Sequence, residues 1–124
     1  MPIKIRLQRR GRKGTPFYHI VVADSRFPRD GKFIETLGIY NPLTKIIKMH
    51  IDSAVFWLEK GAKPTDTARF LLSKLGVLFK KHLIIGVKKG ALDKREAENL
   101  FLKWIKKNNN VSVDKNLLVF DKEK

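Results

Sequence analysis

Four cationic side chains lie within five positions near the start of the sequence: Arg9, Arg10, Arg12 and Lys13. Guanidinium groups bind phosphate oxygens through paired hydrogen bonds, and the glycines between and after these residues let a sugar-phosphate chain approach the backbone. A charge run of this kind is usually a solvated hairpin tip. Because Lys4 and Arg6 extend the same cationic strip along the preceding segment, we expect phosphate contacts here.

A second group of cations consists of Arg26, Arg29 and Lys32, which flank a connector rich in Pro, Gly and Asp. Arginines interleaved with aromatic residues suit RNA, whose bases unstack onto rings and guanidinium planes. Phe27, in the connector itself, is a candidate for such stacking. The aromatic residues of the neighbouring strands are better explained as core.

A third group of cations lies between residues 80 and 89. It begins with Lys80 and Lys81 and continues through His82 to Lys88 and Lys89, with no acid between them. This pattern fits a phosphate-binding track and a solvated flank of a helix-to-loop segment about equally well. We include Lys80 and Lys81 among the candidate RNA-binding residues.

An enzymatic alternative uses Asp24, Asp30 and Glu35 as the Mg²⁺ ligands of a nuclease. Turn capping or pairing with arginine explains the two aspartates more simply. The three histidines have no partner at metal-ligand spacing, and the absence of cysteine excludes thiolate sites and a Cys nucleophile. We therefore expect neither a reaction nor a cofactor, and no small-molecule substrate.

The whole chain of 124 residues is strongly basic, with 27 Lys and Arg against 12 Asp and Glu and a net charge of +15. Nine of those cations and only two acids fall within residues 1–32. Such an imbalance calls for a polyanionic partner. A generic binder of DNA or anionic surfaces therefore stays open as a second alternative. We expect no membrane span or signal peptide, because no apolar run is long enough.

Apolar and cationic side chains alternate over residues 3–7, and this pattern predicts a strand with one apolar and one basic face. Residues 9–16 then predict a basic loop, and residues 17–23, 33–40 and 45–49 predict further strands. Helices should follow, capped by Asp52, Thr65 and Asp93. Strands followed by helices predict an α+β fold: a mainly antiparallel sheet of four to five strands, with helices on one side.

Several uncommon strings resemble, in order, the bacterial ribosomal protein S sixteen family. They are IKIRLQRRGRKGTPFYHIVVADSR (residues 3–26), GKFIETLGIYNP (residues 31–42), the helix around Trp57, the Gly61–Ala62 pair and TDTA (residues 65–68). The similarity covers roughly residues 2–76. Residues 77–124 run past the shorter family pattern. We therefore expect an RNA-binding core domain over 1–76 and a basic C-terminal extension over 77–124, with a helix near 93–107.

The resemblance implies a structural protein of the small ribosomal subunit, of bacteria or of organelles of bacterial descent. Because no presequence is recognised, we expect the bacterial cytoplasm rather than an organelle. The protein's partners would be the five-prime domain of the small-subunit ribosomal RNA and neighbouring proteins, notably the fourth and twentieth of the series. It would stabilise RNA helix junctions during assembly. The positions that fall in the family's motif stretches are Arg6, Arg9, Arg12, Lys13, Tyr18, Ser25, Arg26, Asn41 and Pro42. The basic ones are expected to contact RNA.

Overall fold

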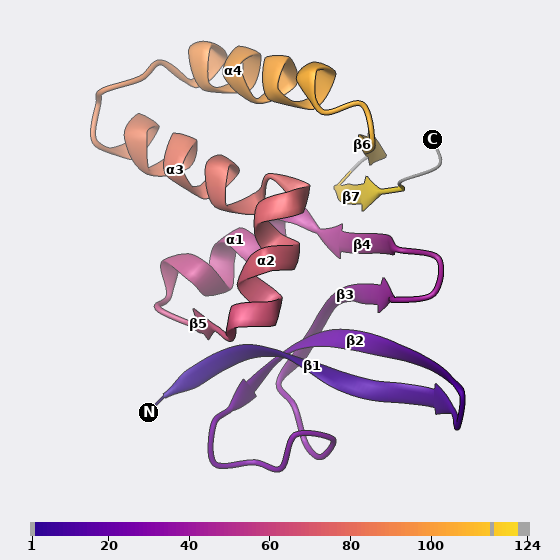
Figure 1. Cartoon of the computed structure of the whole chain (residues 1–124). Helices are drawn as coiled ribbons and strands as arrows, with labels where there is room; N and C mark the ends of the chain where they lie inside the picture. The colour runs from indigo at the N-terminus through magenta and orange to yellow at the C-terminus, as the bar shows by residue number, and fades with distance from the viewer. Residues whose placement is uncertain (1, 115, 122–124) are drawn as a thin grey trace.

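The computed structural model describes residues 2–114 and 116–121, which form an α+β structure around one twisted sheet (Figure 1). The sheet has seven strands in the order β5-β1-β2-β3-β4-β7-β6. The strands are β1 (Ile3–Arg12), β2 (Thr15–Asp24), β3 (Glu35–Asn41), β4 (Ile46–His50), β5 (Lys63–Pro64), β6 (Val111–Asp114) and β7 (Leu117–Phe120). The expected count of four to five was wrong, because β5, β6 and β7 are too short to leave a periodic pattern.

All strand pairs are antiparallel except β1 with β5. The β1–β2 hairpin is the longest element of the sheet, and its pairing continues from Ile3↔Asp24 to Arg12↔Thr15. The loop expected over residues 9–16 is therefore strand, apart from the two residues Lys13 and Gly14. The register explains this difference, since backbone hydrogen bonding continues past the last apolar residue of β1.

In the described part of the chain, four helices complete the fold: α1 (Ile51–Glu59), α2 (Asp66–Leu75), α3 (Val77–Lys88) and α4 (Lys94–Lys107). Thr65 and Asp93 cap α2 and α4 as expected, each accepting a backbone N–H bond. Asp52 does not cap α1. That helix begins at Ile51 after His50, whose side chain makes no capping bond, and Asp52 lies in its first turn.

Helix α3 was expected only as a helix-to-loop segment. It follows α2 after a single residue, Gly76, whose φ of 80° ends one helix and lets the next begin in a new direction. A side chain at Gly76 would come within 2.6 Å of the Trp104 ring, so α4 packs directly against this corner.

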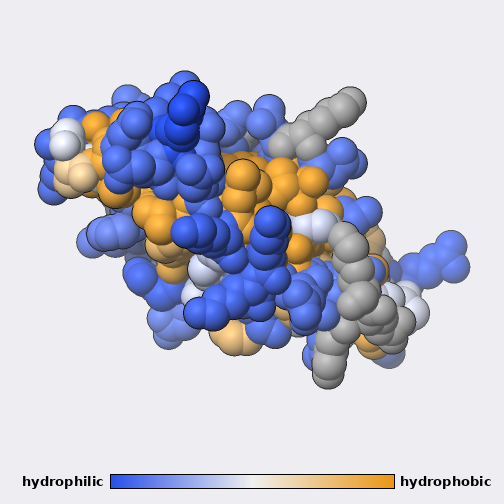
Figure 2. Space-filling model, turned by 90° about the horizontal axis from the view of Figure 1, so that it is seen from above, coloured by the Kyte–Doolittle hydropathy of each residue, from blue (hydrophilic) through white to orange (hydrophobic). Residues whose placement is uncertain are grey.

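The hydrophobic core lies between the sheet and the helices. Its fully buried members come from every layer: Ile5, Ile20, Leu37, Ile47, Met49, Leu71, Leu72, Leu75 and Leu118. None of the helices in the described ranges is long and apolar enough to cross a membrane. Figure 2 views the molecule from above, the α4 side, and shows apolar residues gathered in the middle of this face with hydrophilic side chains around them.

The C-terminal segment is joined to the rest of the sheet. Strand β7 pairs with β4 from Ile47↔Phe120 to His50↔Leu117, and β6 forms the outer edge beside it. Helix α4 lies along α3, where the rings of Phe79 on α3 and Trp104 on α4 have centroids 6.4 Å apart. The division at residue 76 stays a prediction, although Leu118 lies in the same core cluster as Ile5.

Candidate nucleic-acid interface

The half of the β1–β2 hairpin that ends at the turn presents three exposed cations, Arg9, Arg12 and Lys13, which we name the basic tip. Gly11 and Gly14 have φ of 88° and 89°, in the left-handed region that favours glycine. A side chain at Gly11 would meet the Thr15 carbonyl oxygen at 2.5 Å. The glycines therefore let the two strands close tightly, which holds the basic tip on a rigid support.

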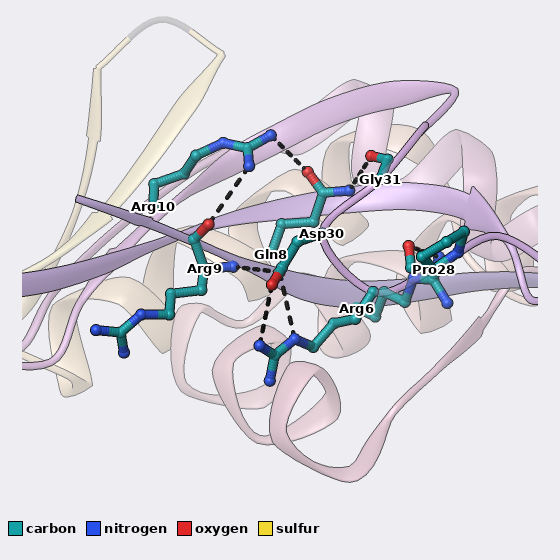
Figure 3. Close-up of polar contacts among 8 residues, drawn as sticks. Arg6, Gln8, Arg9, Arg10, Pro28, Asp30 and Gly31 are labelled. Carbon is teal, nitrogen blue, oxygen red and sulfur yellow. Dashed lines mark hydrogen bonds and ion pairs between the residues drawn. The ribbon is translucent and has the colours of Figure 1, made fainter. Parts of the chain in front are cut away.

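Behind the basic tip, residues 25–34 form a connector between β2 and β3 that folds back along β1 (Figure 3). Arg6 Nη2 donates to the carbonyl oxygens of Phe27 at 2.7 Å and Pro28 at 3.1 Å. Gln8 Nε2 donates to the Gly31 carbonyl at 2.7 Å. These side chains of β1 hold the connector in place.

Two expected phosphate-binding residues are thus engaged inside the protein. Arg6 is half-buried against the connector, and Arg10 donates to Gln8 Oε1 at 2.8 Å. Sequence reasoning assigned no role to Gln8, which is 0% exposed and links Arg10 to Gly31. The sequence feature that could have identified Gln8 is that it is a neutral polar residue among the cations on the basic face of the strand.

The connector is stabilised at its beginning by Asp24 and Arg26. Arg26 donates from its backbone N, Nε and Nη2 to the Asp24 carboxylate at 2.7–3.0 Å. These bonds lower the pKa of buried Asp24 to about 2. Arg26 itself stays exposed, so its guanidinium faces solvent with one side committed to the carboxylate.

Further along the connector, Arg29 forms an ion pair with Asp30 at 3.0 Å. The Asp30 carboxylate also accepts from the backbone N of Arg9 at 2.9 Å. The bond from Arg29, and then that from the backbone of Arg9, lower the pKa of Asp30. Lys32 is exposed and Phe27 is half-buried, and base stacking on Phe27 stays a prediction.

The carboxylates invoked for a Mg²⁺ nuclease do not assemble a metal site. Asp24 and Asp30 are each paired with an arginine, and Glu35 is half-buried on β3. Within residues 2–114 and 116–121, no group of three or more His, Cys, Asp or Glu side chains could hold a metal ion. The two aspartates instead shape the connector.

The remaining candidate cations lie on other segments. Lys4 is half-buried near the start of β1, and Lys80 and Lys81 are half-buried on α3, which Figure 1 draws away from the turn of the β1–β2 hairpin. Lys80 Nζ lies 4.8 Å from the centroid of the Phe101 ring. That ammonium group helps pack α4 on α3, so it is less available to a phosphate than the cluster of cations between residues 80 and 89 suggested.

Comparisons with a family model and with known proteins all indicate the same family of ribosomal proteins. The family model described as ribosomal protein S16 matches residues 9–65. The chain is 60% identical over 108 residues to the small ribosomal subunit protein bS16 of Porphyromonas gingivalis strain W83, covering 86% of this chain and 56% of that protein. It therefore spans little more than half of that relative's length.

A relative of more similar length is the small ribosomal subunit protein bS16 of Amoebophilus asiaticus. It is 53% identical over 106 residues, which cover 84% of this chain and 89% of that protein. The bS16 protein of Flavobacterium johnsoniae is 52% identical over 107 residues, covering 85% and 57%. These alignments are longer than residues 2–76, so they include part of the chain beyond residue 76.

Proposed function

The chain belongs to the ribosomal protein S16 family, and we propose that it is an RNA-binding structural component of the small ribosomal subunit. The family consists of ribosomal proteins and not of enzymes. The observation that best supports RNA binding is the basic tip, where Arg9, Arg12 and Lys13 are exposed on the hairpin. The connector of residues 25–34 is bonded to strand β1 of this hairpin.

The proposed mechanism is electrostatic. Cations on a rigid hairpin displace the counterions of RNA phosphates, and little conformational freedom is lost on binding because the hairpin is already ordered. The partner we propose is the five-prime domain of the small-subunit ribosomal RNA, with neighbouring small-subunit proteins alongside. Holding RNA helices at a junction would reduce the motion of the RNA before later proteins add.

The test is a binding titration against five-prime-domain RNA and a scrambled RNA of equal length, over a series of salt concentrations. We expect the cognate RNA to keep a large advantage at high salt. If both RNAs weaken together and converge, the protein is a nonspecific binder of polyanions and the assignment fails.

The same titration locates the RNA-binding surface. The double variant R9E/R12E should weaken cognate binding and reduce the slope of affinity against salt by about 2, one for each RNA phosphate that the variant no longer neutralises. The matched control is K94E/R95E, which reverses two exposed cations on α4. An equal weakening of binding in the two variants would show that net charge, rather than the basic tip, determines affinity.

A further inference from the structure

An open groove of about 530 Å³ lies along the edge of β1, beyond the point where β5 stops pairing. Its lining includes Arg6, Leu7, Tyr18, Arg29, Tyr40 and Thr65. The volume falls within the range of about 300–1,000 Å³ typical of small-ligand sites. The lining combines two tyrosines with two arginines, while no Asp or Glu belongs to it among the described residues.

Tyr18 and Tyr40 supply two neighbouring aromatic rings, which we name the tyrosine ledge. They are cross-strand partners on β2 and β3, and their rings stack with centroids 6.4 Å apart and planes inclined by 21°. Both are half-buried. A partly exposed pair of parallel rings is the kind of platform on which unpaired bases stack.

The β1 edge supplies polar groups beside this ledge. Ile5 O accepts from Thr65 N at 2.9 Å, and Arg9 N donates to Asp30 at 2.9 Å. Outward-pointing backbone groups belong to alternate residues of an edge strand. Leu7, midway between them, therefore directs its N–H and C=O toward the groove that it lines.

Both arginines of the lining are held in position. Arg29 is paired with Asp30, yet its side chain is 66% exposed and free to meet a second anion. Arg6 is fixed by the bonds from its Nη2 to the Phe27 and Pro28 carbonyl oxygens of the connector.

We propose that this groove binds one unstacked RNA nucleotide. Its base lies on the tyrosine ledge, its polar edge meets the Leu7 backbone, and its phosphate faces Arg29. The inference rests on the proposed function, because the nucleotide belongs to the ribosomal RNA that the basic tip contacts. The groove adds recognition of an extruded base to an otherwise electrostatic interaction.

The first experiment is ultraviolet crosslinking of the full chain to five-prime-domain RNA, followed by mass spectrometry of the peptides. A crosslinked nucleotide on Tyr18 or Tyr40 is expected. Y18L should weaken cognate binding about ten-fold, in keeping with the loss of one stacked base. Y40F, which keeps the ring and removes only the hydroxyl, should bind with near-wild-type affinity.

The matched control is F70L, which removes an aromatic ring that is 56% exposed on α2 and does not line the groove. If Y18L destabilises the fold, R29A tests the same groove, since it removes an exposed side chain while its partner Asp30 still accepts from the Arg9 backbone. If Y18L and R29A both fold and bind with wild-type affinity, and the crosslinks fall elsewhere, the proposed nucleotide site in the groove is wrong. Preferential binding of cognate RNA by the wild type would still support the proposed function. Loss of preference for cognate RNA in the wild type removes both.

Discussion

At the residue scale, the bonds between Asp24 and Arg26 show how a charged pair can shape a binding surface without itself being the contact. The carboxylate lies buried at the end of β2 and accepts three hydrogen bonds from Arg26. Those bonds favour its ionised form, which is why its pKa falls. The pair determines where the connector begins.

Replacing Asp24 by Asn should lower stability in a pH-dependent way. The folded-state pKa of about 2 lies below the ordinary 3.8, so the ionised group stabilises the protein above about pH 4, and this contribution is lost as the pH falls toward 2. Urea midpoints of wild type and D24N should differ at pH 7, and the difference should shrink steadily as the pH falls from about 4 toward 2. A gap that stays constant over that range would contradict the assignment.

Replacing Gly11 by Ala should destabilise the hairpin more than the same change at Gly14. Both residues have positive φ, which costs an L-residue about 1–2 kcal/mol. Only at Gly11 does the new Cβ also meet backbone, the Thr15 oxygen at 2.5 Å, whereas nothing lies within 4 Å at Gly14. Free energies of unfolding from urea titration check the order, and equal decreases at the two positions would contradict it.

At the scale of elements, the connector and β1 act as one unit. A strand with a cationic face would by itself expose that face to water. Here residues 25–34 lie against it and are held by Arg6, Gln8 and the backbone of Arg9. The basic surface is thereby shifted from the middle of β1 to the basic tip and the outside of the connector.

Replacing Gln8 by Ala should release the connector without unfolding the sheet. The change leaves the Gly31 carbonyl and the Arg10 guanidinium without the Gln8 amide as a partner, which costs about 1–3 kcal/mol. Trypsin cleavage after Arg26, Arg29 and Lys32 should then accelerate relative to wild type. Lys32→Gln, which removes one exposed cleavage site, provides the control for site accessibility. Unchanged cleavage in Q8A would show that other contacts suffice.

At the scale of the whole molecule, the C-terminal hairpin completes the sheet. Without β7, strand β4 would present an open edge next to the core residues Ile47 and Met49. Leu118 from β7 is 0% exposed and lies in the cluster that also contains Ile5 and Leu72. Contacts between the chain's two ends therefore contribute to one core.

Replacing Leu118 by Ala should cost about 2–5 kcal/mol of unfolding free energy, the usual loss for a fully buried leucine. Val113→Ala, on the neighbouring strand but 41% exposed, should change stability by about 0.5 kcal/mol or less. A single cooperative transition shifted by L118A is expected. A shift confined to a separate minor transition would instead support an independent extension over residues 77–124.

The sequence by itself determined the class of the fold, the first four strands, the caps of α2 and α4 and the basic character of the hairpin. These depend on local periodicity, on capping residues such as Thr65 and on charge density, which act over a few neighbouring residues. The sequence also indicated the family, because the uncommon short strings that resemble it can be recognised, in order, without the structure.

The tertiary structure alone decided which cations of the hairpin are exposed. Arg6 looked equivalent to Arg9 and Arg12 in the sequence, yet its partner Phe27 is 21 residues away along the chain and reaches it only in the fold. Gln8, which binds Arg10, is likewise held by Gly31 of the connector. Pairing of β7 with β4, and of Tyr18 with Tyr40, likewise joins residues far apart along the chain. Such contacts depend on the register and packing of the complete core, which no local pattern encodes.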